Sequence, residues 1–225
     1  MKRFYTLLIL LSGIITLKGF GQATNDPAAK KVLDGVSTKF KTFKTVKATF
    51  TYKVENAAGK SLSSKTGSVA MKGTKYRVMI VGQEIFCDGA NVWTYDKAAN
   101  EVTITKLDNT SNTLTPQKLF TDFYDKDFLY KLNGEKKQGT KTLQEIEMTP
   151  TDKSKPFHKV YVYVDKTGKT LASTKVMEKS GNRYSYTVNT LTPNGTIDDK
   201  QFIFDAKKYP CQATDLCEQY QLCTQ

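Results

Sequence analysis

The sequence predicts a mainly β protein of the α+β class, built on a single strongly curved antiparallel sheet of about eleven strands with two helices. Apolar residues recur with a period of two over most of the chain from Thr45 onward, which is the pattern of strands that bury one face. Short turns that contain Gly separate these stretches, as in an antiparallel meander. A helical period appears only in residues 28–43 and 115–124. Two helices cannot cover so long a sheet, so we expect a concave face lined by apolar side chains.

The first 21 residues have the pattern of a secretory signal peptide. Met1-Lys2-Arg3 is basic, and the apolar run over residues 4–17 is shorter than the roughly 20 residues of a membrane span. Gly19 and Gly21 are small residues before an expected cleavage between Gly21 and Gln22. We therefore expect an exported chain with one domain over residues 22–208 and a Cys-containing tail over residues 209–225.

The first helix is expected to begin at Pro27, because Asn25-Asp26 supplies a cap and proline is favoured at the first helical position. Apolar residues at spacings of three and four continue to Phe43 and include Phe40. This helix is amphipathic, so its apolar stripe is expected to lie on the sheet.

Strands follow with the apolar residues of each on a common face. In the first strand this face holds Val46, Ala48, Phe50, Tyr52 and Val54. A second strand ends at Val69-Ala70-Met71-Lys72, and in the third Tyr76, Val78 and Ile80 share a face. The remaining strands are expected at residues 85–87, 92–95, 101–105, 128–132, 143–148, 158–165, 171–177, 183–191 and 201–204.

The hairpin over residues 82–96 carries the only tryptophan, Trp93. Phe86, Trp93 and Tyr95 are large apolar groups that must be buried against a core, a lid or a ligand. We interpret them as residues that shape an apolar cavity or the core beside it. Strand alternation places Cys87 on the opposite face from Phe86, so the sequence predicts that Cys87 does not contact the same cavity.

A polar loop over residues 107–112 interrupts the strands before the second helix. Thr115-Pro116 is expected to start this short helix. Its apolar face is unusually aromatic and comprises Leu119, Phe120, Phe123 and Tyr124.

The spacing of the cysteines favours a structural role over a redox or metal-binding role. Cys211, Cys217 and Cys223 lie at six-residue intervals, which is not the spacing of a redox or zinc site. A structural disulfide among them is compatible with an oxidising compartment, and free thiols are the alternative. We expect no metal and no cofactor.

The net charge of +12 is strongly basic and comes mostly from lysines spread along the chain. Such a pattern is typical of solvated strand faces, and the alternative is a docking face for acidic partners or anionic lipid. Nucleic acid is not an expected partner of an exported protein.

The sequence contains no group of residues typical of an enzyme active site. It has one histidine, His158, and none of the motifs G-x-S-x-G, H-E-x-x-H, the P-loop or the dinucleotide fingerprint. We therefore predict that the protein is not an enzyme.

Several short motifs together resemble the LolA family of periplasmic lipoprotein carriers. These are the first helix ending near Lys41-Thr42-Phe43, the strands Ala48-Thr49-Phe50-Thr51 and Lys75-Tyr76-Arg77-Val78, Asp88-Gly89 followed by Val92-Trp93-Thr94-Tyr95, Thr115-Pro116 with Leu119-Phe120, and Phe202-Ile203-Phe204-Asp205. The order and spacing of these motifs carry the resemblance, which covers the chain from about Asp26 to Asp205.

The resemblance implies an unclosed β-barrel with the two helices as a lid, which holds lipoprotein acyl chains in an apolar cavity. It implies a monomer in the periplasm that receives lipoproteins from an inner-membrane exporter and passes them to an outer-membrane acceptor. The alternative is a related binding protein for another lipid or a glycolipid, or an envelope sensor. The residues expected to contact acyl chains are Phe40, Phe50, Tyr52, Met71, Tyr76, Val78, Ile80, Phe86, Trp93, Leu119, Phe120 and Phe123.

Two features depart from the family pattern. Many members carry an Arg soon after the second strand that latches the barrel to the lid, whereas here Lys72 is followed by Gly73-Thr74. The resemblance supplies no counterpart for the Cys-containing tail after Tyr209-Pro210.

Overall fold

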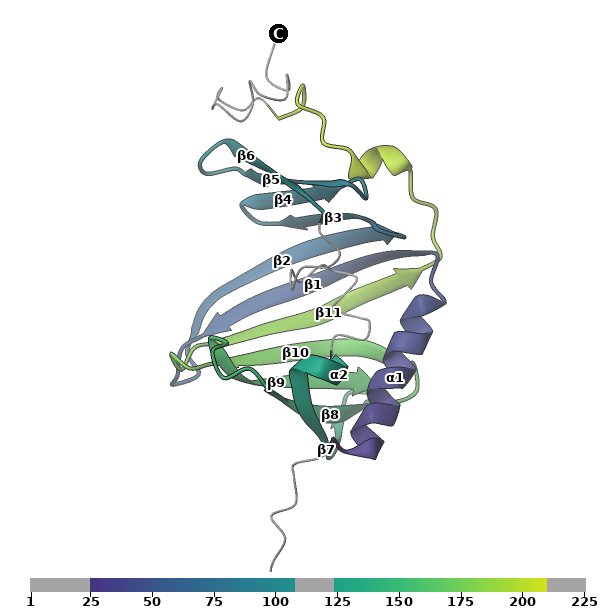
Figure 1. Ribbon diagram of the computed structural model, residues 1–225, viewed down its shortest axis with the longest axis vertical. Coiled ribbons are helices and arrows are strands. Elements are labelled where there is room, and N and C mark those ends of the chain that lie inside the picture. Colours follow the sequence, from purple (N-terminus) through teal and green to yellow (C-terminus); the bar gives the residue numbers. More distant parts are fainter. Residues whose placement is uncertain (1–24, 108–123, 210–225) are drawn as a thin grey trace, which may run out of the picture.

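A computed structural model describes residues 25–107 and 124–209 of the protein. Eleven antiparallel strands form one sheet in the order β6-β5-β4-β3-β2-β1-β11-β10-β9-β8-β7. Strands β6 and β7 are the two edges of this sheet, so the barrel is not closed (Figure 1). The predicted fold class is confirmed.

The elements follow the expected order along the chain. The helices are α1 (Pro27–Lys41) and the four-residue α2 (Tyr124–Asp127). The strands are β1 (Thr45–Glu55), β2 (Ser61–Lys72), β3 (Lys75–Ile80), β4 (Gln83–Cys87), β5 (Asn91–Asp96), β6 (Glu101–Lys106), β7 (Phe128–Gln138), β8 (Lys141–Pro150), β9 (Phe157–Asp165), β10 (Thr170–Glu178) and β11 (Arg183–Pro193).

Helix α1 is fixed to the edge strand β7 by the residues that cap it. The Oδ1 atom of Asp26 accepts a hydrogen bond from the N–H of Ala28, and its Oδ2 atom accepts one from the N–H of Leu132. The Oδ1 atom of Asn25 accepts from the N–H of Tyr130. The two bonds to Asp26 hold the pKa of its carboxyl below its ordinary value, the bond from Leu132 most of all. The cap therefore sets where the helix begins and where it lies.

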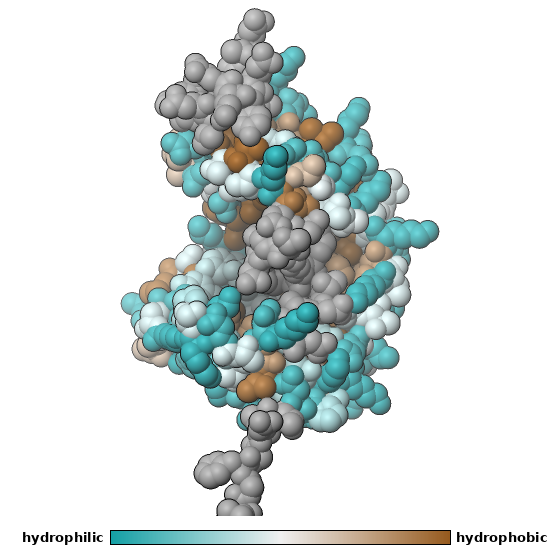
Figure 2. Space-filling model, viewed as in Figure 1, coloured by the Kyte–Doolittle hydropathy of each residue, from teal (hydrophilic) through white to brown (hydrophobic). Residues whose placement is uncertain are grey.

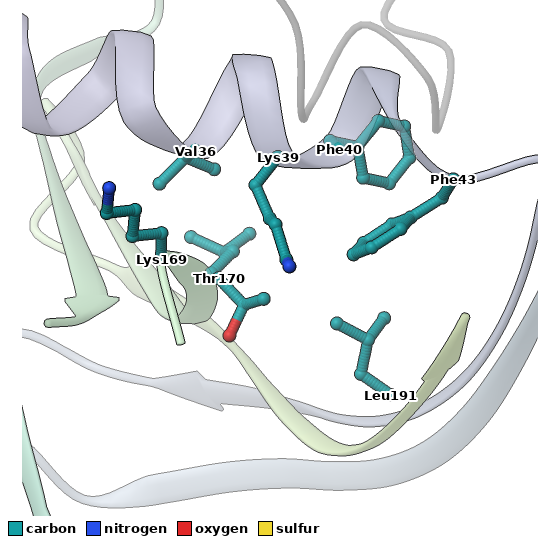
Figure 3. A pocket seen from close by; sticks show the side chains of 8 residues that line it. Val36, Lys39, Phe40, Phe43, Lys169, Thr170 and Leu191 are labelled. Carbon is teal, nitrogen blue, oxygen red and sulfur yellow. The ribbon is translucent and has the colours of Figure 1, made fainter. Parts of the chain in front are cut away.

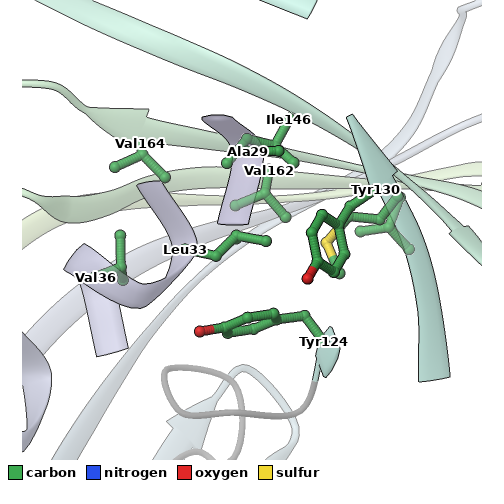
Figure 4. Close-up of a cluster of buried hydrophobic side chains, with 10 residues drawn as sticks. Ala29, Leu33, Val36, Tyr124, Tyr130, Ile146, Val162 and Val164 are labelled. Carbon is green, nitrogen blue, oxygen red and sulfur yellow. The ribbon is translucent and has the colours of Figure 1, made fainter. Parts of the chain in front are cut away.

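The apolar stripe of α1 packs on one face of the sheet, which we call the inner face. Ala29, Leu33 and Val36 are buried there against residues of β7, β8 and β9 (Figure 4). The cluster consists of Ala29, Leu33, Val36, Tyr124, Tyr130, Ile146, Met148, Val160, Val162 and Val164. We call the opposite side of the sheet the outer face.

The structure corrects the last predicted strand. Residues 199–202 form a 3-10 helix, and no strand follows among the described residues. The Asp198 side chain caps this helix by accepting a hydrogen bond from the N–H of Lys200. Phe202 and Phe204 are both buried, so the alternation indicates the buried side chains correctly. Their burial comes from packing on the sheet rather than from pairing with a strand.

Candidate functional site

The inner face is the candidate binding surface, because α1 covers only part of it. Its second apolar cluster lies on the strands from β1 to β4 and contains Val46, Met71, Tyr76 and Cys87. Phe40 and Phe43, at the end of α1, pack against this cluster. Burial raises the pKa of the Tyr76 hydroxyl to about 12, which is the behaviour of a polar group in a dry interior. In the space-filling view, apolar residues show as patches on this side of the molecule, between hydrophilic ones (Figure 2).

A small pocket lies between the C-terminal part of α1 and strands β10 and β11 (Figure 3). Its walls are formed by Val36, Lys39, Phe40, Phe43, Lys169, Thr170, Leu171 and Leu191. The cavity volume is about 10 Å³, which is room for about one water molecule. We call this pocket the seam. It is too small for an acyl chain while α1 rests on the sheet.

Beyond α1, aromatic side chains of β1 and β11 continue the inner face. The Tyr52 ring lies 4.9 Å from Tyr186 and stacks on Tyr184 at 6.1 Å, measured between ring centroids. Phe50 lies beside Tyr186 at 6.5 Å. A Cβ atom at Gly67 would lie only 2.5 Å from the Phe50 ring, so this glycine makes room for it. Tyr186 is 43% exposed, and the row is a partly open apolar surface.

The hairpin of β4 and β5 divides its residues between the two faces. Cys87 pairs with Tyr76, and Ile85 pairs with Val78, so Cys87 lies on the inner face. Phe86 pairs with Arg77 and with Trp93, and these three side chains lie on the outer face. The sequence separates Cys87 from Phe86 correctly. However, Cys87, not Phe86, shares the face that α1 covers.

The outer-face aromatics are buried by the chain segment that follows β11. Phe204 lies 5.7 Å from Phe86 and stacks on Trp93 at 6.5 Å, between ring centroids. Tyr209 lies 5.5 Å from Phe86 and 5.0 Å from Tyr95. We call residues 198–209 the C-terminal strap. Phe86 and Trp93 thus belong to a second core beneath this strap.

A buried carboxylate fastens the strap to the sheet. Glu84 accepts hydrogen bonds from Arg77 Nη2 and the Tyr209 hydroxyl, both at 2.8 Å, and pairs with Lys97 at 3.0 Å. Burial alone would raise the pKa of Glu84, but the bonds from Arg77, Lys97 and Tyr209 outweigh it and hold the pKa below its ordinary value. The Arg77 guanidinium also lies 4.6 Å from the centroid of the Phe86 ring.

The other end of the strap is held by Asp199, which supplies a pH-dependent contribution to stability. Its carboxylate pairs with Lys72 at 2.6 Å and Lys75 at 2.8 Å, and these bonds lower its pKa from 3.8 to about 2. The unfolded chain then binds the proton more readily than the folded one. We expect this stabilisation to be complete above about pH 5 and to disappear as the pH falls toward 2.

Urea unfolding of the wild type and of Asp199→Asn between pH 2 and pH 7 measures this contribution. The two proteins should differ in free energy of unfolding at neutral pH and converge in acid. A difference that is independent of pH would contradict the assignment. High salt should reduce the difference at neutral pH, since the ion pairs are exposed.

The structure places the predicted contact residues in three groups. Seven lie on the inner face or on α1 above it: Phe40, Phe50, Tyr52, Met71, Tyr76, Val78 and Ile80. Phe86 and Trp93 lie on the outer face beneath the strap. Leu119, Phe120 and Phe123 lie outside the described residues, as do Cys211, Cys217 and Cys223.

Sequence reasoning singled out only Phe40 among the residues of the seam. Leu171 and Leu191 come from strands far apart from α1 in the chain, and Phe43 follows the last helical turn. The period-two pattern indicates that Leu171 and Leu191 belong to strand faces, but it does not indicate that α1 rests on these strands. Cys87 carries a free thiol on the same face, and burial raises its pKa.

The described ranges hold no cluster of three or more potential metal ligands. In the same ranges, neither helix combines the length and the hydropathy needed to cross a membrane.

A family model described as outer membrane lipoprotein carrier protein LolA matches residues 41–205. Among solved structures, an uncharacterized conserved protein from Thermus thermophilus is similar, with a TM-score of 0.53 and 13% identity over 78% of this chain and 92% of that one. MucB gives a TM-score of 0.49 at 16% identity over 83% of this chain and 65% of that one. Mycobacterium tuberculosis lipoprotein LppX gives a TM-score of 0.48 at 13% identity over 77% of this chain and 100% of that one. No curated protein sequence matches the chain significantly.

Proposed function

The chain belongs to the LolA family of outer membrane lipoprotein carrier proteins, and we propose that it is a periplasmic carrier of lipoprotein acyl chains. In this proposal it receives lipoproteins from an inner-membrane exporter and delivers them to an outer-membrane acceptor. The apolar inner face binds the acyl chains, and the protein supplies no covalent chemistry.

The observation that carries this proposal is an apolar inner face larger than the helix that covers it. The half-exposed rings of Phe50, Tyr52 and Tyr186 lie on the same face of the sheet as the buried clusters beneath α1. Monomeric proteins seldom expose a continuous apolar surface without a ligand or partner for it. An acyl chain has the shape and the polarity to cover it.

Cargo entry requires α1 to move away from β10 and β11. The seam of about 10 Å³ admits about one water, whereas an acyl chain must replace the contacts of Val36, Phe40 and Phe43 with the sheet. The cap at Asp26 ties the N-terminal end of α1 to β7. The C-terminal end, near the seam, is therefore the end that opens.

This exchange of contacts keeps the affinity within a range that allows release. Burial of each CH₂ contributes about 0.8 kcal/mol, so a sixteen-carbon chain contributes roughly 12 kcal/mol if it is fully buried. Detaching one buried Val or Phe costs about 1.5 to 3 kcal/mol. Because the chain replaces helix contacts instead of adding to them, part of its burial free energy is offset.

Native mass spectrometry of protein purified from the periplasm tests the proposal. Co-purifying lipoprotein supports the lipoprotein carrier. Bound free lipid or glycolipid without lipoprotein supports the second candidate, a binding protein with another cargo. A protein that stays empty, and that also takes up no acyl-chain probe in solution, would contradict both.

One observation favours the second candidate. Lys72 is the last residue of β2, the strand after which many family members carry a latching Arg. Here Lys72 pairs with Asp199 of the strap. The basic group at this end of β2 thus holds the outer-face strap instead of a lid. A carrier with a different lid contact is compatible with a different cargo.

A further inference from the structure

Two lysines border the seam pocket from opposite sides. Lys39 comes from the last turns of α1, and Lys169 comes from the turn between β9 and β10. Figure 3 shows the Lys39 side chain extending from the helix into the pocket, with its ammonium toward the sheet. Lys169 adopts a positive φ of 51°, and its Cδ atom would lie 3.8 Å from a Cβ atom at Gly35 of α1. Both amines are thus carried to the edge of one apolar space.

The protein does not neutralise these two charges. In the part of the chain that the structure describes, no ion pair joins either ammonium to a carboxylate. The acidic side chains nearest in sequence have other partners. Asp34 is bound by Lys30 and the Tyr124 hydroxyl. Asp165 accepts hydrogen bonds from the N–H groups of Thr167 and Gly168 and pairs with Lys141.

Several lysines on the sheet are neutralised by glutamates. Lys53 and Lys175 both pair with Glu55, and Lys159 pairs with Glu147. At the seam, by contrast, two exposed amines stand beside apolar walls made by Val36, Phe43 and Leu191. A positively charged rim beside an apolar space matches a ligand with an anionic head and an apolar tail.

We propose that Lys39 and Lys169 bind the phosphate headgroup of an anionic lipid whose acyl chain lies on the inner face beneath α1. The assignment rests on the proposal that the inner face binds acyl chains, and it specifies a phospholipid, which is the kind of cargo that the second candidate function carries. Each ammonium offers three N–H donors, and a phosphate offers several acceptor oxygens for them. The headgroup stays at the solvent-exposed rim while the chain enters between α1 and β10.

Binding of two lysophospholipids with the same acyl chain tests this assignment. Lysophosphatidylglycerol carries a net negative charge, and lysophosphatidylcholine is zwitterionic. Both displace a fluorescent fatty-acyl probe from the protein, at concentrations below micelle formation and at low salt. The wild type is expected to bind the anionic lipid about 25-fold more tightly, and high salt should reduce this preference.

The variants Lys39→Gln and Lys169→Gln should each lower the affinity for the anionic lipid about fivefold, which corresponds to one exposed ion pair, and together about 25-fold. Affinity for the zwitterionic lipid should fall much less, because its choline cation compensates the charge of its phosphate. Lys47→Gln/Lys60→Gln is the matched control, since both lysines are exposed and Lys47 points to the outer face of β1. This control should retain the full preference.

Equal affinity of the wild type for the two lipids, or a preference that survives in Lys39→Gln/Lys169→Gln, would overturn the headgroup site but leave the carrier intact. Failure to bind either lipid would contradict the proposed function itself. Inorganic phosphate is the third probe. If it displaces the anionic lipid at a similar concentration, the lysines form a free-phosphate site and the assignment to a lipid is wrong.

Discussion

Replacing Phe40 by aspartate is expected to abolish acyl-chain binding in a protein that remains folded. Phe40 lies at the seam and packs with Phe43 against the inner-face cluster, with 6.0 Å between the two ring centroids. It is only partly buried, so the empty protein can turn a carboxylate at this position toward water. A bound chain would bury the carboxylate without a partner, at a cost of several kcal/mol. We expect at least about a 100-fold loss of affinity for a fluorescent fatty-acyl probe.

Thr38→Asp is the matched control, because it adds the same charge to the exposed side of α1 two residues away. It should bind the probe like the wild type. Phe40→Leu, which keeps an apolar side chain, should lose only a few-fold. Circular dichroism confirms that each variant is folded. Undiminished probe binding by folded Phe40→Asp would show that the chain does not pass beneath this part of α1.

Replacing Phe86 by alanine is expected to produce a large loss of stability with no loss of acyl-chain affinity. Phe86 is 2% exposed and contacts Phe204, Tyr209 and the Arg77 guanidinium on the outer face. Truncation of a buried Phe typically costs about 3 to 5 kcal/mol. Urea unfolding should therefore show a much lower midpoint, and the probe should bind normally well below that midpoint.

Phe50→Ala is the comparison on the inner face. Its ring is half-buried above Gly67, so truncation should cost about 1 to 2 kcal/mol of stability and should weaken probe binding several-fold. Phe86→Ala should thus lower the stability without changing the affinity for the probe. Phe50→Ala should lower the affinity for the probe with a smaller loss of stability. Loss of probe affinity in folded Phe86→Ala, with normal affinity in Phe50→Ala, would reverse our assignment of the two faces.

The fold could be predicted from local patterns because its elements are regular. The period of two from Thr45 onward identifies the strands, and the cap at Asp26-Pro27 marks the start of α1. Short antiparallel connections leave little choice of neighbours for β1 to β6 and for β7 to β11. The remaining choice, the pairing of β1 with β11, requires contacts between distant parts of the chain.

The candidate site could be predicted only in part. Alternation groups Tyr76, Val78 and Ile80 on one face, and it separates Phe86 from Cys87, but it does not say which face is covered by α1. The strap decides this for β4 and β5, since Phe204 and Tyr209 cover Phe86 on the outer face. The residues of the hairpin itself do not indicate which of its faces the strap covers. The pair Lys39 and Lys169 is also brought together only by tertiary structure.

Photolabelling with a fatty-acyl probe that carries a diazirine at the end of its chain tests the central claim most directly. Labelled residues are identified by peptide mass spectrometry after irradiation of the complex. We predict labels on the inner face and beneath α1, at Phe40, Val78, Leu171 or Leu191, and none on Phe86 or Trp93. Labels concentrated on the outer-face aromatics, with the inner face unlabelled, would contradict the account.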